Sequence, residues 1–145
     1  MRRTFLSTLG WFFIGCFLFL VAPVLRAAGG DEAAIAHVGD TFLKGYIGAK
    51  DPFGYLNKSP LVTPAVKNAL KTLQKKSEGF IEADPVTGGN DRADVYLTTH
   101  VHIQGETATA QGTAKGWPSI PLRFVHSKDS WVIDGAGDLN KSGKH

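Results

Sequence analysis

Two histidines, His100 and His102, stand at alternate positions of a stretch in which polar and apolar residues alternate. Alternate residues of a β-strand point to the same face, so the two imidazoles could bind one metal ion. Zinc sites use three or four protein ligands, and only the fold could bring a third ligand such as Asp94, His126 or His37 close. Histidines on a polar strand face are otherwise solvated or hydrogen-bonded. We expect this second outcome, with no metal or cofactor bound.

Three carboxylates, Asp84, Asp91 and Asp94, belong to one loop that also contains Gly88 and Gly89. Oxygen ligands on a bendable loop suit Ca²⁺, but the spacing lacks the alternate ligand positions and the terminal glutamate of an EF-hand. Carboxylates in turns commonly accept hydrogen bonds from nearby backbone amides. We therefore expect these side chains to fix the loop rather than to bind a cation.

A histidine next to a carboxylate can act as a general base, and His100 with Asp94 is the pair that this strand offers. No second catalytic group is recognisable, and the sequence contains no Gly-x-Ser-x-Gly elbow, phosphate-binding loop or dinucleotide-binding glycine pattern. A small enzyme that uses a cavity His/Asp pair is therefore an alternative. The leading hypothesis is a domain that binds without catalysis.

Aromatic and cationic side chains could line such a binding cavity or its rim. Trp117 stands between Gly116 and Pro118 in an expected loop, and exposed loop aromatics are good anchors for partners. Trp131 lies in an expected strand, where a tryptophan fills core volume and its indole nitrogen needs a partner. The residues that we expect to line or border the site are Tyr46, Tyr96, His100, Trp117 and Arg123.

In the first half of the chain that follows residue 30, apolar residues recur with the spacing of helices. Apolar residues at three- and four-residue intervals predict a helix over 31–49, with Asp31 as its N-cap and Pro52 just beyond its end. Thr63 and Pro64 predict the start of a second helix, as its N-cap and its first residue. Its lysines lie opposite the apolar face and are interpreted as the solvated side. Residues 53–56 are expected to form only a connecting segment.

The second half has the period of strands. One face of the first strand is expected to carry Val95, Leu97, Thr99, Val101 and Ile103, and the other face Asp94, Tyr96, Thr98, His100 and His102. Alternation over 107–114, 120–126 and 131–133, with turns at 104–106 and 128–129, predicts adjacent antiparallel strands. Helices first and strands last predict an α+β domain, with the leading helices packed on one face of a curved antiparallel sheet.

The front of the chain has the pattern of an export signal. Arg2 and Arg3 precede an apolar run over 5–25, and small residues follow Arg26. We expect cleavage between Ala27 and Ala28, so that 1–27 is a signal peptide. The run is also long enough to cross a bilayer, so the alternative is an uncleaved anchor in the inner membrane. Residues 28–140 are then expected to form one domain, and 141–145 a flexible tail.

Removing this leader changes the charge of the protein. It contains three of the sixteen basic residues and none of the thirteen acidic ones, which leaves thirteen of each in the body. A balanced body has no strong positive field for phosphate backbones, so nucleic-acid binding is disfavoured. The only cysteine, Cys16, also lies in the leader, so the body can form neither a disulfide nor a cysteine nucleophile.

Two short motifs resemble a known family. One runs from Gly79 through Asp84-Pro85 to Asn90-Asp91, and the other is the closing Trp-Val-Ile-Asp-Gly at 131–135. They are similar to an acidic Asp-Pro loop and a Trp-x-Ile-Asp strand end in small exported bacterial domains of unknown function with the nuclear-transport-factor-like, cystatin-like fold. The resemblance covers about 33–138. It implies a curved sheet wrapped around a long helix as an open-mouthed cone, used for ligand binding, dimerisation or, in some branches, acid/base catalysis. It implies no catalytic residue here.

Together these features predict an exported, non-enzymatic binding module in the periplasm or secreted medium. Its expected partner is a small ligand, an envelope protein or a second copy of the chain. The membrane is a partner only through the leader, if that segment is retained. A third alternative, an immunity-type inhibitor of a secreted toxin, would present a protruding acidic or aromatic surface instead of a cavity.

Overall fold

The computed structural model describes residues 28–141. Three α-helices, α1 (Ala28–Gly48), α2 (Pro52–Lys58) and α3 (Pro64–Lys76), precede four strands, β1 (Leu97–Gln104), β2 (Thr107–Thr113), β3 (Ile120–Ser127) and β4 (Ser130–Ala136), and a 3₁₀-helix, η1 (Gly137–Lys141), follows. The fold is α+β, as predicted from helical apolar spacing in the first half of the sequence and strand alternation in the second. The expected leader, 1–27, and residues 142–145 of the expected tail lie outside the described residues. Within 28–141, no helix has both the length and the apolar character to span a bilayer.

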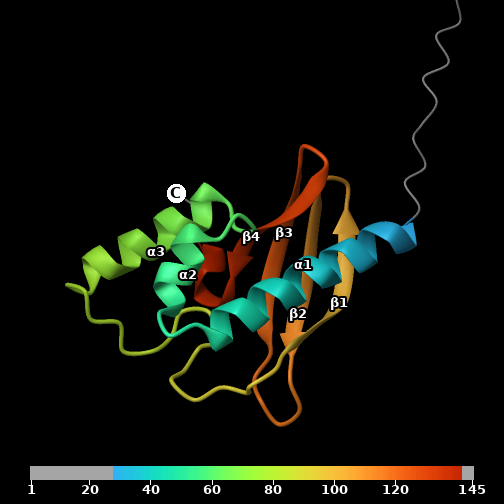
Figure 1. Ribbon diagram of the computed structural model, residues 1–145. Helices are drawn as coiled ribbons and strands as arrows, with labels where there is room; N and C mark the ends of the chain where they lie inside the picture. The colour runs from blue at the N-terminus through green and yellow to red at the C-terminus, as the bar shows by residue number, and fades with distance from the viewer. Residues whose placement is uncertain (1–27, 142–145) are drawn as a thin grey trace, which may run out of the picture.

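The four strands form one sheet in the order β1-β2-β3-β4, with every neighbouring pair antiparallel. Figure 1 shows α1 crossing one face of this sheet, with α2 and α3 beside β4. Just before α3, Val62 forms an isolated parallel bridge with Ile133 of β4. The chain therefore covers the β4 edge with its own backbone, which protects an edge that could otherwise pair with another chain.

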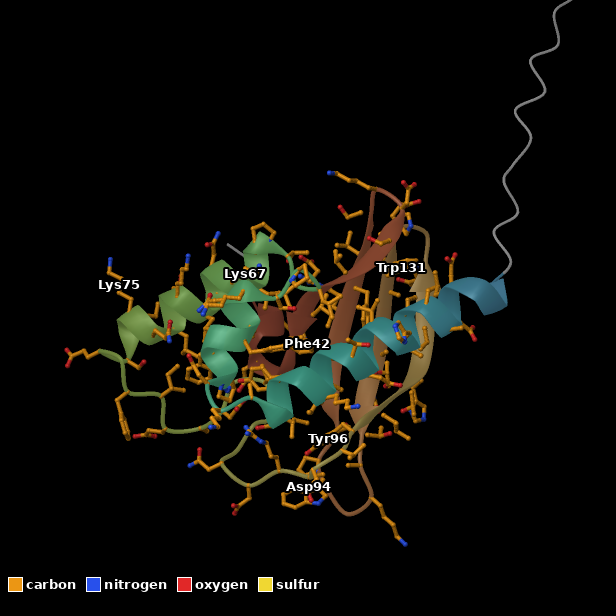
Figure 2. The ribbon with its side chains drawn as sticks, in the orientation of Figure 1. Phe42, Lys67, Lys75, Asp94, Tyr96 and Trp131 are labelled. Carbon is orange, nitrogen blue, oxygen red and sulfur yellow. The ribbon has the colours of Figure 1, made fainter. Side chains whose placement is uncertain are left out.

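Large apolar side chains fill the space between α1 and the sheet. Phe42, Leu43 and Tyr46 of α1 are fully buried in one core with Phe124 and Ile133, and Phe42 also lies near Tyr55 of α2, with ring centroids 6.2 Å apart. Figure 2 shows Phe42 within the body of the protein. Burying each side chain of this size stabilises the fold by roughly 1.5–3 kcal/mol. The space under α1, where an open cone would have its cavity, is thus packed.

The first helix begins earlier than the capping pattern predicts. The expected N-cap, Asp31, lies within α1, because residues 28–30, the first that the structure describes, are already helical. The Asp31 carboxylate accepts a hydrogen bond from the indole nitrogen of Trp131, at 3.3 Å. This contact fastens the first turn to β4, and it offsets the poor helix propensity of Gly29 and Gly30. Trp131 is 4% exposed, as expected for a core tryptophan.

The prediction that 53–56 form only a connecting segment is wrong. The proline that ends the first helix begins α2, where Asp51 is the N-cap and its side chain accepts from the Gly54 amide at 2.9 Å. A capping aspartate followed by proline at the first helical position is a standard helix start. The buried Leu56 then fixes this short helix to the core.

The prediction that Val95, Leu97, Thr99, Val101 and Ile103 share one face of the first strand is also wrong. The register of β1 against β2 shifts between Thr99 and His102, and His100 has a positive φ of 53°. Such a bulge places an extra residue in one strand and reverses the alternation beyond it. Val95 and Leu97 are therefore 67% and 57% exposed. The inward positions of the strand region are Tyr96 and Thr98 before the bulge and Val101 and Ile103 after it.

Helix α1 also covers part of the free edge of β1. At Gly39 the helix comes so close that a Cβ would overlap the Thr98 side chain. The next residue, Asp40, accepts a hydrogen bond from the Thr98 amide at 2.6 Å. An edge amide that would be open to a foreign strand is thus satisfied within the protein.

Candidate binding site on the outer face of the sheet

The structure brings together two of the five residues expected at a binding site. His100 and Arg123 line the same hollow. Tyr46 is fully buried and Tyr96 is 4% exposed, so both belong to the core and not to an accessible rim. Trp117 is 40% exposed in the loop between β2 and β3. It is not among the residues that line the hollow.

This outer-face hollow lies on the side of the sheet opposite α1 and has a volume of about 400 Å³. Alternation in the two middle strands turns Thr109, Gln111 and Arg123 outward, while their neighbours Ala110 and Leu122 are buried. The bulge places His100 at the β1 side of the hollow. From the other side η1 contributes Asn140, which lies over Gly135, where a Cβ would overlap the asparagine side chain.

Hydrogen bonds hold the Arg123 guanidinium in place at the edge of the hollow. The Arg123 Nη2 donates to the Asp134 carboxylate at 2.8 Å and to its backbone oxygen at 3.0 Å. The other carboxylate oxygen of Asp134 accepts from the Thr63 hydroxyl at 2.9 Å. With its side chain 39% exposed, Arg123 is fixed in direction and still faces solvent. The guanidinium is therefore oriented before any ligand arrives, which lowers the entropy cost of binding.

One donor and one acceptor at this hollow are buried without a partner. In the described part of the chain, Arg123 Nε and Asn140 Oδ1 have no hydrogen-bond partner, although the Asn140 amide nitrogen donates to the Pro121 carbonyl at 3.0 Å. Leaving a buried polar atom unpaired costs about 1–3 kcal/mol. Both atoms are enclosed by the protein, so the groups that a ligand can reach in the hollow are the exposed Arg123 guanidinium and the other polar side chains that line it.

The histidines do not form the acid-base pair or the metal site considered from the sequence. His100 shares a hydrogen bond with the Thr99 hydroxyl, at 2.9 Å between Nδ1 and Oγ1. Within residues 28–141, neither His100 nor His102 bonds a carboxylate, and no group of three or more potential metal ligands occurs. His126 lies 3.2 Å from the carboxylate of Glu106, which is itself largely exposed. The described geometry therefore gives a general-base role no support.

The Asp91 and Asp94 side chains form no hydrogen bond or ion pair among residues 28–141, so the expectation that they fix the loop is wrong. Asp84 does fix its loop, as expected for a carboxylate in a turn. It accepts from the backbone amides of Val86 and Thr87, at 2.8 and 3.0 Å. The Tyr46 hydroxyl donates to the same carboxylate at 3.0 Å, and Arg92 forms an ion pair with it at 3.2 Å. Burial, followed by the negative charge of Asp84, raises the pKa of the Tyr46 phenol far above its ordinary value. Asp84 thus ties α1 to the segment that leads into β1.

Three polar residues of the hollow were missed from the sequence. Thr109 and Gln111 stand at outward positions of a correctly predicted strand, so their alternation could have identified them. Asn140 follows the last strand and gives no local signal, because η1 returns over the sheet only through tertiary packing.

Comparison with protein-family models, curated proteins and solved structures gives no match for this chain.

Proposed function

We propose that this protein is an exported, non-enzymatic binding module that holds its ligand in the outer-face hollow. The observation that carries the proposal is the Arg123 side chain, which Asp134 holds in a fixed direction and which remains 39% exposed at a surface hollow lined by polar groups. Export is supported by the basic, apolar and small-residue order of the leader.

The side chains of the hollow favour binding over catalysis. Thr109, Gln111 and Asn140 are neutral hydrogen-bonding groups, and Arg123 already has a carboxylate partner. Such a set can orient a ligand that has both donors and acceptors. A proton-transfer role would need a base within hydrogen-bond reach of an activating or reacting group. His100 instead bonds a threonine hydroxyl.

We also propose that the fold is a densely packed variant of the nuclear-transport-factor-like, cystatin-like architecture. A long helix across an antiparallel sheet supports this assignment. So do the position of the Asp84 loop between the helices and β1 and that of Trp131 in the last strand. In this variant the interior is filled, and binding moves to the opposite face of the sheet.

The binding proposal is tested with ¹⁵N-labelled protein and a set of small carboxylic acids and amides as probes. We expect amide shifts that cluster at residues 100, 109–111 and 122–123. His100→Asn should weaken them, because asparagine tolerates the positive φ but lacks the imidazole. The matched control is His102→Asn, an exposed histidine on the same strand. Shifts spread evenly over the surface, or equal effects of the two variants, would contradict the proposal.

Export is tested separately by fractionating cells and measuring the mass of the protein. We expect a periplasmic or secreted chain that begins at Ala28. A full-length chain in the cytoplasmic fraction would contradict it.

A further inference from the structure

Three hollows follow one another around η1. The first, which we call the α3 hollow, has a volume of about 530 Å³ and is lined mainly by apolar groups such as Leu73, Phe80 and Ile81. The second, the middle hollow, has a volume of about 410 Å³ and is lined by Val86, Thr87 and Pro118 among others. The third is the outer-face hollow.

Shared residues show that these hollows are neighbours. Asp138 lines both the α3 hollow and the middle hollow. Pro121 and Asn140 line both the middle hollow and the outer-face hollow. The three therefore adjoin one another in a row, which we call the groove, from the end of α3 past η1 to the outer face of β3. A small molecule would fill one hollow, whereas an elongated ligand could use all three.

The chemistry of the groove changes along its length. At one end Phe80 is 73% exposed, the most exposed large apolar side chain in the described part of the chain. Here the exposed Glu82 provides a negative charge. At the other end lie the exposed polar side chains of His100 and Gln111 and the Arg123 guanidinium. The α3 hollow thus favours an apolar group. The outer-face hollow favours a group that both donates and accepts hydrogen bonds.

We infer that this groove binds an extended polypeptide segment of a partner protein. An apolar side chain of the segment occupies the α3 hollow, and a peptide group or a carboxylate occupies the outer-face hollow. This inference rests on the proposed function and names its ligand. Three adjoining hollows of this size extend over about 20–30 Å, which an extended segment of about six to nine residues would span.

Two features favour a peptide. A peptide group has one N–H donor and one C=O acceptor, which can pair with the Gln111 side-chain oxygen and the exposed Arg123 guanidinium in the outer-face hollow. Side chains of an extended peptide also point alternately in opposite directions, so that separate hollows can receive separate side chains. The lysines of α3 do not add a positive charge to this groove, because none of them lines any of the three hollows. Figure 2 shows Lys75 projecting from the far end of that helix, away from the sheet.

The test uses the purified protein to select from a phage-displayed library of random twelve-residue peptides. Selected sequences are then synthesised with a fluorescent label, and their dissociation constants are measured by anisotropy. We expect a shared motif with an apolar residue several positions from an acidic or amide-bearing one. Phe80→Ala at one end and Gln111→Ala at the other should each weaken binding about tenfold. Val95→Ala, which shortens an apolar side chain that is 67% exposed and lies outside the groove, should leave the affinity unchanged.

The outcomes separate this inference from the proposed function. Loss of affinity in both Phe80→Ala and Gln111→Ala, with unchanged melting temperatures, supports one groove for one peptide. Loss in Gln111→Ala alone overturns the extended groove, while binding at the outer-face hollow survives. Selection without any shared motif also overturns the peptide inference, as does selective binding of soluble oligosaccharides in a parallel screen. In these cases the small-molecule amide shifts at residues 100, 109–111 and 122–123 still decide whether the hollow binds at all.

Discussion

Replacing Tyr46 with phenylalanine removes the hydroxyl that connects α1 to the Asp84 loop. Tyr46 is fully buried and donates to both Asp84 oxygens, at 3.0 and 3.1 Å. A hydrogen bond to a charged group contributes about 1.5–3 kcal/mol. Unfolding entropy of about 2.1 cal/mol/K per residue over roughly 115 residues gives about 0.24 kcal/mol/K, so the melting temperature should fall by about 6–12 °C.

The same substitution has a second effect at high pH. Burial and the Asp84 charge raise the pKa of Tyr46 in the folded protein, whereas a tyrosine in the unfolded chain ionises near its ordinary value of about 10. The unfolded state therefore loses a proton that the folded state retains. This contribution to stability is complete below pH 10. Above that pH it falls by about 1.4 kcal/mol for each pH unit until the folded pKa is reached.

The assay is urea unfolding of wild type, Tyr46→Phe and Tyr55→Phe between pH 7 and 11. Tyr55 is the matched control, because its hydroxyl has no hydrogen-bond partner among residues 28–141. Tyr46→Phe should be the less stable variant at pH 7, and its stability should decline less steeply than that of wild type above pH 10. Parallel curves above pH 10, or equal losses in the two variants at pH 7, would refute the reasoning.

Two further substitutions test how the sheet is held. Asp40→Ala should cost about 1–3 kcal/mol and speed hydrogen exchange at the Thr98 amide, because that amide loses its acceptor; Asp40→Asn keeps an oxygen there and should cost less, and unchanged exchange in Asp40→Ala would count against edge protection. Gly137→Ala should destabilise the protein more than Gly105→Ala in thermal melts. Both glycines have positive φ, but only at Gly137 would a Cβ overlap backbone, at Pro85 and Val86; equal losses would contradict this.

The order of the two periods in the sequence was enough to predict the fold class. Apolar spacing located α3, whose start at Pro64 agrees with the predicted cap position, and alternation located the later strands. These signals are local, because they depend on which side chains an isolated helix or strand can bury on one face. The fixing role of Asp84 was local as well, since two of its donors are amides two and three residues along the chain.

Predictions were wrong where tertiary contacts overrode local patterns. The bond from Trp131 to Asp31 joins residues one hundred positions apart, and it is associated with a helix start that capping rules misplace. The bulge at His100 exchanged the inward and outward positions in the second half of β1. No glycine or proline in the strand indicates it in the sequence. Residue types alone therefore placed Tyr46 and Tyr96 at a binding site, although both are buried in the core.

The sequence by itself determined the class of fold, the charge balance of the body and the absence of thiols from it. All three depend on composition and short-range order. Only the tertiary structure decided that the interior is filled and that a groove runs around η1. A groove is made by surfaces from distant segments, and whether side chains fill or leave a space depends on how those segments pack. No local pattern contains that information.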